Sequence, residues 1–484
     1  MNRRHFLLLG PLAAIAVRLL LAHHGALPAT MAGLVAWMAV WWISEAVPIA
    51  ITSLLPLVVL PFFGVADVGS TAANYGKEII FLFLGGFLLA LGIESSGLHR
   101  RIALHIVLRL GGSASRLVLG VMAASAFLSM WINSTAAVLV LLPIALSLVD
   151  GLSGEARSGN LAIPMLLGVS YGATIGGMAT PVGTPPNLVL MQLWSELFPE
   201  LPRLGFGQWM AFALPFSVVF LLIAWLLLVR VIFPQGNDRL AARSELRERL
   251  HHLGPMERDE RWTGLLFACT ALLWVTGDGL ELGPGVDLPG WRELTGAEAV
   301  TDAAVAVGMA ILLFVLPSGK GKSRRLLAWD DAEKRVPWGV LLLIGSGFAL
   351  AMGIERSGLD QVLAQGIVRL SDLHPALMLF GLVLVVMLLS ELGSNTATAA
   401  LVLPILARSA DAMATDPVLL LVPATLAASL GFMLPIASPM HTIVFATGRI
   451  PVRTMVRAGV WMDLLGAMLL VGTYLLLGRL VFAA

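Results

Sequence analysis

The sequence is poor in cysteine and in charged residues, and both shortages narrow its class. Cys269 is the only cysteine among 484 residues, which excludes an intrachain disulfide and a cysteine-based metal site. Charged residues make up 13% of the chain, whereas soluble domains have about 25%. Hydrophobic residues make up 58%, and the mean hydropathy is +0.88. These values indicate a membrane protein, and the formal net charge of +1 gives no reason to expect a nucleic-acid partner.

The sequence contains long apolar runs in which charged residues are nearly absent. Residues 338–354 and 458–478 contain almost no ionisable side chain, and about 20 such residues cross the hydrocarbon core as a helix. The whole set of runs predicts an all-α membrane protein with about 11 transmembrane helices. Residues 1–27 begin with Arg3 and Arg4 before an apolar run, as a signal peptide does, but no clear cleavage site follows. We therefore expect residues 1–27 to form the first transmembrane helix.

The charges of the loops predict an orientation. Segments 234–261 and 318–336 each carry six lysine or arginine residues, whereas 277–300 has Arg292 as its only base against five acids. Basic loops stay on the cytoplasmic side, so the first two segments are expected in the cytoplasm and the third outside. The N-terminus is then cytoplasmic and the protein lies in the inner (plasma) membrane. Segment 234–261 is expected to form a linker helix on the cytoplasmic surface.

The sequence repeats itself. The stretch that begins at Gly86 returns 261 positions later at Gly347, and the proline motif at Pro181 returns 254 positions later at Pro435. Loop 99–116 holds four arginines, while its counterpart 356–375 balances two arginines with two aspartates, so the copies are expected to face opposite ways. We predict two inverted repeats, residues 28–233 and 262–484, an arrangement typical of alternating-access transporters.

Each repeat contains an apolar segment with a polar centre. Residues 117–149 have no charge, yet Asn133-Ser134-Thr135 lies in the middle between two arms of 14 residues, each about 21 Å long as a helix. Residues 376–408 repeat the pattern around Ser394-Asn395-Thr396. Such arms are too short to span the core, so both segments are predicted to be re-entrant hairpins. Helix N-termini at their tips suit an anion, and their oxygens suit a hard cation.

Each repeat also contains a helix interrupted by proline. Residues 161–198 are broken at Thr180–Asn187, and residues 418–448 at Pro435–Pro439, because proline removes a donor and blocks the helical turn. Irregular backbone at membrane depth is tolerated only where it is buried or lines a cavity. The hairpin tips and the breaks contain no lysine or arginine, so a bound dianion would need cations to balance it, which predicts sodium coupling. For any single tip or break, the alternative is that its serine, threonine or proline residues only serve the packing between helices.

These motifs resemble the divalent anion:sodium symporter family over nearly the whole chain. The most specific matches are Trp41–Pro48, Ser394-Asn395-Thr396 and Thr184–Asn187. The resemblance implies a homodimer with a scaffold domain and an elevator-type transport domain. It also implies a substrate site for dicarboxylates, citrate or sulfate, flanked by two sodium sites. Two departures stand out: the first tip reads Asn133-Ser134, with the family order reversed, and His441 stands where the family has asparagine.

The site residues follow from the motifs and the resemblance together. The substrate site is expected to include Asn133, Ser134, Thr135, Ser394, Asn395, Thr396, Thr184, Pro185, Ser438 and Pro439. The sodium sites are expected to include Asn133, Ser134, Gly183, Thr184, Asn187, Asn395, Ala437 and His441. Neutral histidine is a poor sodium ligand, so His441 either supplies positive charge when protonated or packs beside its break. Glu391 is expected to cap or pair within the transport domain, with cation coupling as the alternative.

The predicted function is secondary active transport of small divalent anions, C4-dicarboxylates foremost, coupled to sodium by an elevator mechanism. No cofactor is expected beyond the coupling sodium ions, and the partners are the dianion, lipid and a second copy of the chain. A sodium-independent or proton-linked dicarboxylate exchanger remains open, as does a carrier of sulfate, citrate or another organic anion. An intramembrane enzyme would need a nucleophile with a base; Ser438 lies near His441, but no second histidine or aspartate accompanies them.

Overall fold

The computed structural model describes residues 3–150, 161–201, 204–235, 242–278, 280–281, 287–319, 325–362, 374–412 and 415–482. These residues are helical, apart from loops and one short antiparallel pair of strands, β1 (Leu280–Glu281) and β2 (Asp287–Leu288). The all-α prediction is therefore confirmed for the described part of the chain. Arg369 and Asp372, which contributed to the predicted orientation of loop 356–375, lie outside the described residues, as do 236–241 of the predicted linker.

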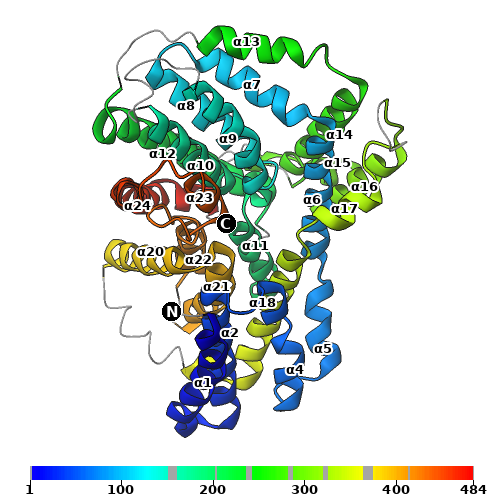
Figure 1. Ribbon diagram of the computed structural model, residues 1–484. Coiled ribbons are helices and arrows are strands. Elements are labelled where there is room, and N and C mark those ends of the chain that lie inside the picture. The colour runs from blue at the N-terminus through cyan, green and yellow to red at the C-terminus, as the bar shows by residue number, and fades with distance from the viewer. Residues whose placement is uncertain are drawn as a thin grey trace.

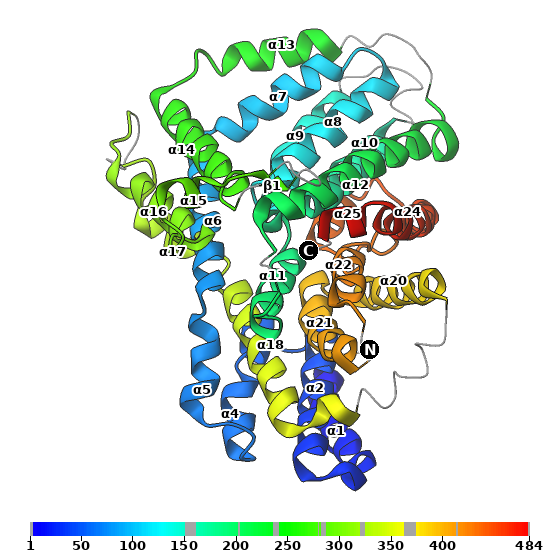
Figure 2. The ribbon, with the colours of Figure 1, turned by 180° about the vertical axis from the view of Figure 1, so that it is seen from behind.

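The helices follow the order of the apolar runs (Figures 1 and 2). The N-terminal half contains α1 (Arg3–Leu20), η1 (Ala22–His24), α2 (Ala26–Ser44), α3 (Ile49–Thr52), α4 (Leu55–Phe62), α5 (Val68–Ala73), η2 (Asn74–Gly76), α6 (Glu78–Ser96), α7 (Leu98–Leu110), α8 (Ala114–Ser129), α9 (Ser134–Asp150), α10 (Ala162–Met178), η4 (Pro181–Gly183), α11 (Pro185–Leu197), α12 (Phe206–Leu226) and η5 (Leu227–Ile232). The C-terminal half contains α13 (Ala242–His252), α14 (Arg258–Val275), α15 (Trp291–Thr295), α16 (Asp302–Val315), α17 (Trp329–Arg335), α18 (Trp338–Ser357), α20 (Pro375–Leu392), α21 (Asn395–Ala412), α22 (Pro417–Ala427), α23 (Pro439–Phe445), α24 (Val452–Thr473), η7 (Tyr474–Gly478) and α25 (Arg479–Phe482).

Six helical segments in the described residues are long and apolar enough to cross a membrane. They begin at Ala26, Val68, Phe206, Trp338, Pro375 and Val452. Shorter apolar helices include α8, α9, α10 and α22, which are the arms and interrupted helices that the sequence marks as unusual. The number of about 11 transmembrane helices stays a prediction.

Helices recur at matching places in the two halves. α6 and α18 both end at a glycine in the left-handed region, Gly97 with φ 82° and Gly358 with φ 74°, a conformation that glycine adopts without a Cβ penalty. α8 and α9 correspond to α20 and α21, α10 to α22, α11 to α23, and α12 to α24 by their place in the repeat. We call residues 179–184 the first break and residues 428–438 the second break; both are non-helical except for η4.

The two halves interlock through the helices that follow the breaks. α11 packs along α21 and α22, and α23 packs against α9 and α10. In both views α11, α21 and α22 lie between the group α7 to α10 and the group α1, α2 and α4. A small apolar cluster joins α2, α4 and α18 to α21 through residues such as Trp42, Leu60 and Ala400. This packing places each break beside helices of the other half.

Candidate functional site

The first hairpin turn, residues 130–133, is built on two serines. Ser129 Oγ, at the end of α8, donates to the carbonyl of Ala173 at 2.6 Å and lies 2.6 Å from Ser134 Oγ at the start of α9. The Ser134 hydroxyl is also 3.2 Å from the carbonyl oxygen of Gly183 in the first break. Asn133 Oδ1 accepts from the backbone N–H of Thr135 at 2.8 Å, which caps the start of α9. Three oxygens, two from the helix ends that flank the turn and one from the break, thus converge.

The second hairpin turn, residues 393–394, has the same construction. Ser390 Oγ lies 2.9 Å from Asn395 Oδ1 and donates to the carbonyl of Ala428 at 2.5 Å. Ser390 stands 261 positions after Ser129, and Asn395 stands 261 positions after Ser134. In each half, a serine therefore links the first residue of the following helix to a carbonyl of a neighbouring segment. Neither Ser129 nor Ser390 was in the predicted site, although the repeat offset relates them.

At the first break, a side-chain amide donates hydrogen bonds to backbone carbonyls. Asn187 is fully buried, and its Nδ2 donates to the carbonyls of Gly177, Met178 and Thr180 at 3.3, 3.2 and 2.8 Å. Asn187 Oδ1 is buried without a hydrogen-bond partner in the described part of the chain. Thr180 Oγ1 accepts from the backbone N–H of Gly183 at 3.1 Å. One amide side chain thus satisfies the carbonyls that the end of α10 leaves open.

At the second break, side-chain carboxylates accept hydrogen bonds from backbone N–H groups instead. Backbone N–H groups of Met433 and Leu434 donate to Glu391 Oε1 and Oε2 at 2.7 and 3.0 Å. The N–H of Phe432 donates to Asp463 Oδ1, on α24, at 3.1 Å. Glu391 therefore caps the break, as the sequence reading favoured. Asp463 was not predicted, and the only sign of it was a lone acid in the apolar run 458–478.

His441 lies inside an aromatic surrounding. Its side chain is 0% exposed, and its ring centroid is 5.5 Å from that of Tyr171 and 5.8 Å from that of Phe432. Nδ1 is hydrogen-bonded to Ser438 Oγ, while Nε2 has no partner among the described residues. No described acid forms a salt bridge with this ring, and a buried unpaired charge is costly. The surroundings favour a neutral imidazole that packs beside the break.

Matched glycines lie next to both oxygen groups. A Cβ at Gly177 would lie 3.0 Å from Ser134 Oγ, 3.1 Å from Gly183 O and 3.2 Å from Ser129 Oγ. A Cβ at Gly431, 254 positions later, would lie 3.4 Å from Ala437 Cβ and 3.9 Å from Asn395 Oδ1. The space beside the first hairpin turn is therefore kept open by the absence of a side chain at Gly177.

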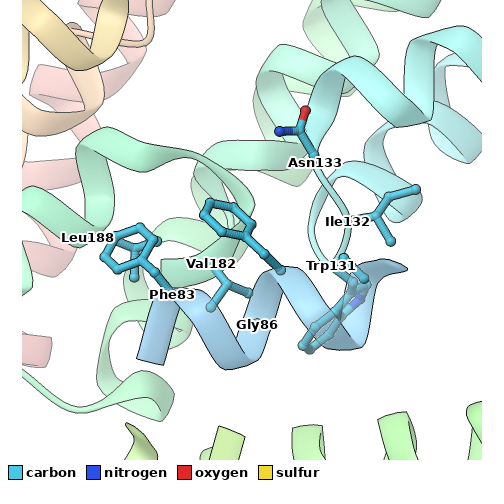
Figure 3. Close-up of a pocket in the computed structure, with 9 residues that line it drawn as sticks. Phe83, Gly86, Trp131, Ile132, Asn133, Val182 and Leu188 are labelled. Carbon is cyan, nitrogen blue, oxygen red and sulfur yellow. The ribbon is translucent and has the colours of Figure 1, made fainter. Parts of the chain in front are cut away.

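A small pocket borders the first break. Figure 3 shows α6 passing the first hairpin turn and the first break, with Phe83, Gly86, Trp131, Ile132, Asn133, Val182 and Leu188 around the space between them. Phe87 and Ala90 complete the lining. Asn133 is the only polar side chain in this set, so the pocket is an apolar contact zone between α6 and the break. It does not resemble a finished site for a dianion.

The structure thus gathers the predicted residues into two groups. Asn133, Ser134, Gly183, Thr184 and Asn187 lie around the first break, whereas Asn395, Ala437, Ser438 and His441 lie around the second. Thr135, Pro185, Ser394, Thr396 and Pro439 occupy the adjoining turn and helix starts and are intermediate or exposed. Convergence of the two tips at one depth of the membrane stays a prediction.

A family model and the similar proteins of known function indicate the same class of protein. Residues 3–483 match the family model described as the sodium:sulfate symporter transmembrane region. The chain is 38% identical over 444 residues to the sodium-dependent dicarboxylate transporter SdcS of Staphylococcus saprophyticus, covering 90% of this chain and 83% of that protein. It is 38% identical over 477 residues to SdcS of Staphylococcus aureus strain RF122, covering 96% and 89%.

Two solved structures share the fold. The Neisseria gonorrhoeae MtrF structure, titled as one of a class of antimetabolite efflux pumps, aligns with TM-score 0.58 at 15% identity, over 84% of this chain and 83% of that one. The Alcanivorax borkumensis YdaH transporter aligns with TM-score 0.57 at 15% identity, over 86% and 88%. At this identity they show the fold alone, that of multi-pass membrane transporters. With the family match over 3–483, the chain belongs to the divalent anion:sodium symporter family and is a multi-pass membrane transporter, not an enzyme.

Proposed function

We propose that this protein carries small divalent anions, C4-dicarboxylates foremost, across the membrane together with sodium. The observation that carries the proposal is the oxygen group at the first break: Ser129 Oγ, Ser134 Oγ and the Gly183 carbonyl converge beside the open space at Gly177. The names of the SdcS relatives, which are 38% identical, agree with this cargo.

The donor set fits a sodium ion as co-transported cargo. All three converging atoms are oxygens, and hard cations prefer oxygen ligands from hydroxyls, amides and backbone carbonyls. Asn187 Oδ1 adds a buried oxygen with no partner among the described residues. The set contains no acid, so a bound sodium would bring a net positive charge to the helix starts of α9 and α11. That charge would attract a dianion, which is the physical basis for coupling.

The second break offers sodium a poorer set. Asn395 Oδ1 is already engaged by Ser390, and position 441 supplies an imidazole in place of an amide. A second sodium ion at Asn395, Ala437 and His441 therefore stays a sequence-based prediction. The dianion itself is expected between the two hairpin turns. The residues expected to hold it are Asn133, Ser134, Thr135, Ser394, Asn395, Thr396, Thr184, Pro185, Ser438 and Pro439.

An elevator movement of a homodimer in the inner membrane, with a cytoplasmic N-terminus, completes the proposal. The apolar zone between α6 and the first break supports it, because a surface of small and aromatic side chains can slide without breaking many polar bonds. In this scheme α6 and α18 belong to the scaffold, while the hairpins and broken helices move.

The test is uptake of labelled succinate into vesicles that contain the purified protein. We expect uptake to require an inward sodium gradient and to be inhibited by unlabelled malate or fumarate more strongly than by sulfate or citrate. Replacement of sodium by choline should abolish it. Uptake that persists in choline only when the vesicles are preloaded with succinate would instead establish a sodium-independent exchanger, and no uptake of any dianion would overturn the proposal.

A further inference from the structure

Two acids meet at the second break, whereas the oxygen group proposed for sodium lies at the first. Glu391 is 2% exposed and Asp463 is 1% exposed, and they come from α20 and α24. Together they accept from the N–H groups of three consecutive residues, Phe432 to Leu434. No salt bridge joins either acid to a lysine, arginine or histidine of the described chain. Their charge is therefore not neutralised by a base.

One oxygen of the pair has no backbone donor. The two carboxyl groups lie side by side, because Asp463 accepts from the N–H of Phe432 and Glu391 accepts from the N–H of the next residue, Met433. Two ionised carboxylates cannot hydrogen-bond to each other, because both are acceptors only. Asp463 Oδ2 is buried and has no donor among the described residues, whereas both oxygens of Glu391 already accept from backbone N–H groups. An O–H on Asp463 that donates to Glu391 satisfies every one of these atoms.

We propose that Glu391 and Asp463 form a proton-binding site that holds the second break in shape. Asp463 carries the proton, and Glu391 carries the single negative charge. That charge accepts three hydrogen bonds, from the N–H groups of Met433 and Leu434 and from the O–H of Asp463. Loss of the proton would place two negative charges side by side in a buried space, where each disfavours the other. The break, and with it Ser438 and the start of α23, would then loosen.

The two halves of the protein thus hold their breaks by opposite means. In the first half Asn187 donates to carbonyls, whereas in the second half the carboxyl pair accepts from N–H groups. Position 463 lies on α24, outside the hairpin and the break, so the pair also fastens α24 to α20. The other titratable groups beside the break are Tyr171, whose hydroxyl donates to the carbonyl of Phe432 at 3.3 Å, and His441. Neither has a hydrogen bond to the pair.

The sign of the pH effect follows from this assignment. The pair binds one proton in the folded protein, and both acids would be ionised in an unfolded chain near neutral pH. Only the folded state holds this proton above about pH 4, so stability should fall steadily as the pH rises from there toward the alkaline range. Transport should fall when the folded pair loses its proton.

The test compares Asp463→Asn, Asp463→Ala and the wild type. Asparagine keeps an oxygen for the N–H of Phe432 and offers a fixed N–H to Glu391, so it mimics the protonated acid. We expect Asp463→Asn to keep transport within about twofold of the wild type and to lose the alkaline decline. Asp463→Ala should lower transport about tenfold or more, since it leaves a buried donor and a charge unsatisfied.

Thermal unfolding of the purified protein across the same pH range supplies a readout without transport. It separates this inference from the proposed function, because it holds whatever the cargo is. Glu260→Gln is the control: Glu260 is equally buried but paired with Arg101 at 2.9 Å, and its loss should leave the alkaline slope unchanged. If Asp463→Asn were as damaged as Asp463→Ala, or if the wild type showed no alkaline loss of stability, the proton site would be refuted.

Discussion

Asn187 and His441 occupy matched positions, 254 residues apart, but their side chains make different contacts. The amide of Asn187 donates to three carbonyls and leaves one buried oxygen without a partner. The imidazole of His441 has one bond to Ser438 and two aromatic neighbours. At the scale of single residues the two breaks have therefore diverged, and the oxygen-rich chemistry is concentrated in the first one.

The glycine beside that oxygen group gives the most direct residue-scale prediction. Gly177→Ala would place a methyl group 3.0 to 3.2 Å from Ser134 Oγ, Gly183 O and Ser129 Oγ, in the space assigned to sodium. We expect the sodium concentration for half-maximal uptake to rise about tenfold or more, a loss of about 1.4 kcal/mol. Gly381→Ala, on α20, is the control, because a Cβ at that position would meet nothing within 4 Å. Equal effects of the two variants would contradict a sodium site at the first break.

A second residue-scale prediction concerns His441. His441→Asn recreates the amide that the first break has, so we expect it to steepen the dependence of uptake on sodium concentration. Since the native ring is buried among Tyr171 and Phe432 without an acidic partner, the variant should not change the pH profile of transport between pH 5 and 7, about the range in which an ordinary histidine titrates. A flattened acidic limb would show instead that a protonated His441 takes part in binding the dianion.

Much of the arrangement of the elements can be read from the sequence. The repeat predicts that α6 and α18 end alike, and the charge-free 117–149 predicts two short helices with a polar turn. Ser129 and Ser390 are harder to find, because serine is common in apolar helices and only its neighbours decide its role. Asp463 is harder still: its partner Glu391 is on another helix, and their meeting depends on how α20 and α24 pack.

Two ion pairs link elements that the elevator scheme assigns to different domains: Lys77 with Glu196, and Arg408 on α21 with Glu355 on α18. Lys77 Nζ, just before α6, lies 2.5 Å from Glu196 Oε1 on α11 and 5.2 Å from the ring centroid of Phe348 on α18. Gln192 Nε2 donates to the same Glu196 oxygen at 2.6 Å. These bonds would have to break if α11 moved relative to α6 and α18, so they stabilise the conformation seen in the structure.

Lys77→Ala should therefore shift the population away from this conformation. The side chains are 31% and 21% exposed, so the ion pair contributes only about 0.5–1 kcal/mol, which corresponds to a two- to fivefold change in the equilibrium between conformations. We expect a change of that size in the transport rate, with little change in sodium affinity. Exchange of the charges, Lys77→Glu with Glu196→Lys, should restore much of the native rate. An altered sodium affinity would argue for a role at the site instead.

At the scale of the whole molecule, the elevator proposal depends on whether α6 and α18 move against the broken helices and hairpins. The structure offers two contacts that report on this. A Cβ at Gly86 would lie 3.7 Å from Val182 Cγ1 of the first break, and a Cβ at Gly347 would lie 3.7 Å from Ala400 Cβ on α21. Gly347 is the repeat partner of Gly86, but the contacts differ: Gly86 meets the first break, whereas Gly347 meets the second hairpin at α21.

Cysteines at these positions should lock the molecule. The native chain has only Cys269, so Cys269→Ser gives a background without other thiols, and Gly347→Cys with Ala400→Cys meets the usual Cβ separation of about 3.5–4.5 Å for a disulfide. We expect oxidation to stop uptake in this pair and in Gly86→Cys with Val182→Cys, and reduction to restore it, while each single variant stays insensitive. Because the two pairs lie in different halves of the repeat, a rigid scaffold that slides past a rigid transport domain should be blocked by either one. Full transport by a completely cross-linked protein would mean that α6, α18 and the breaks keep their contacts throughout the cycle, and movement would then have to be confined to the hairpin turns.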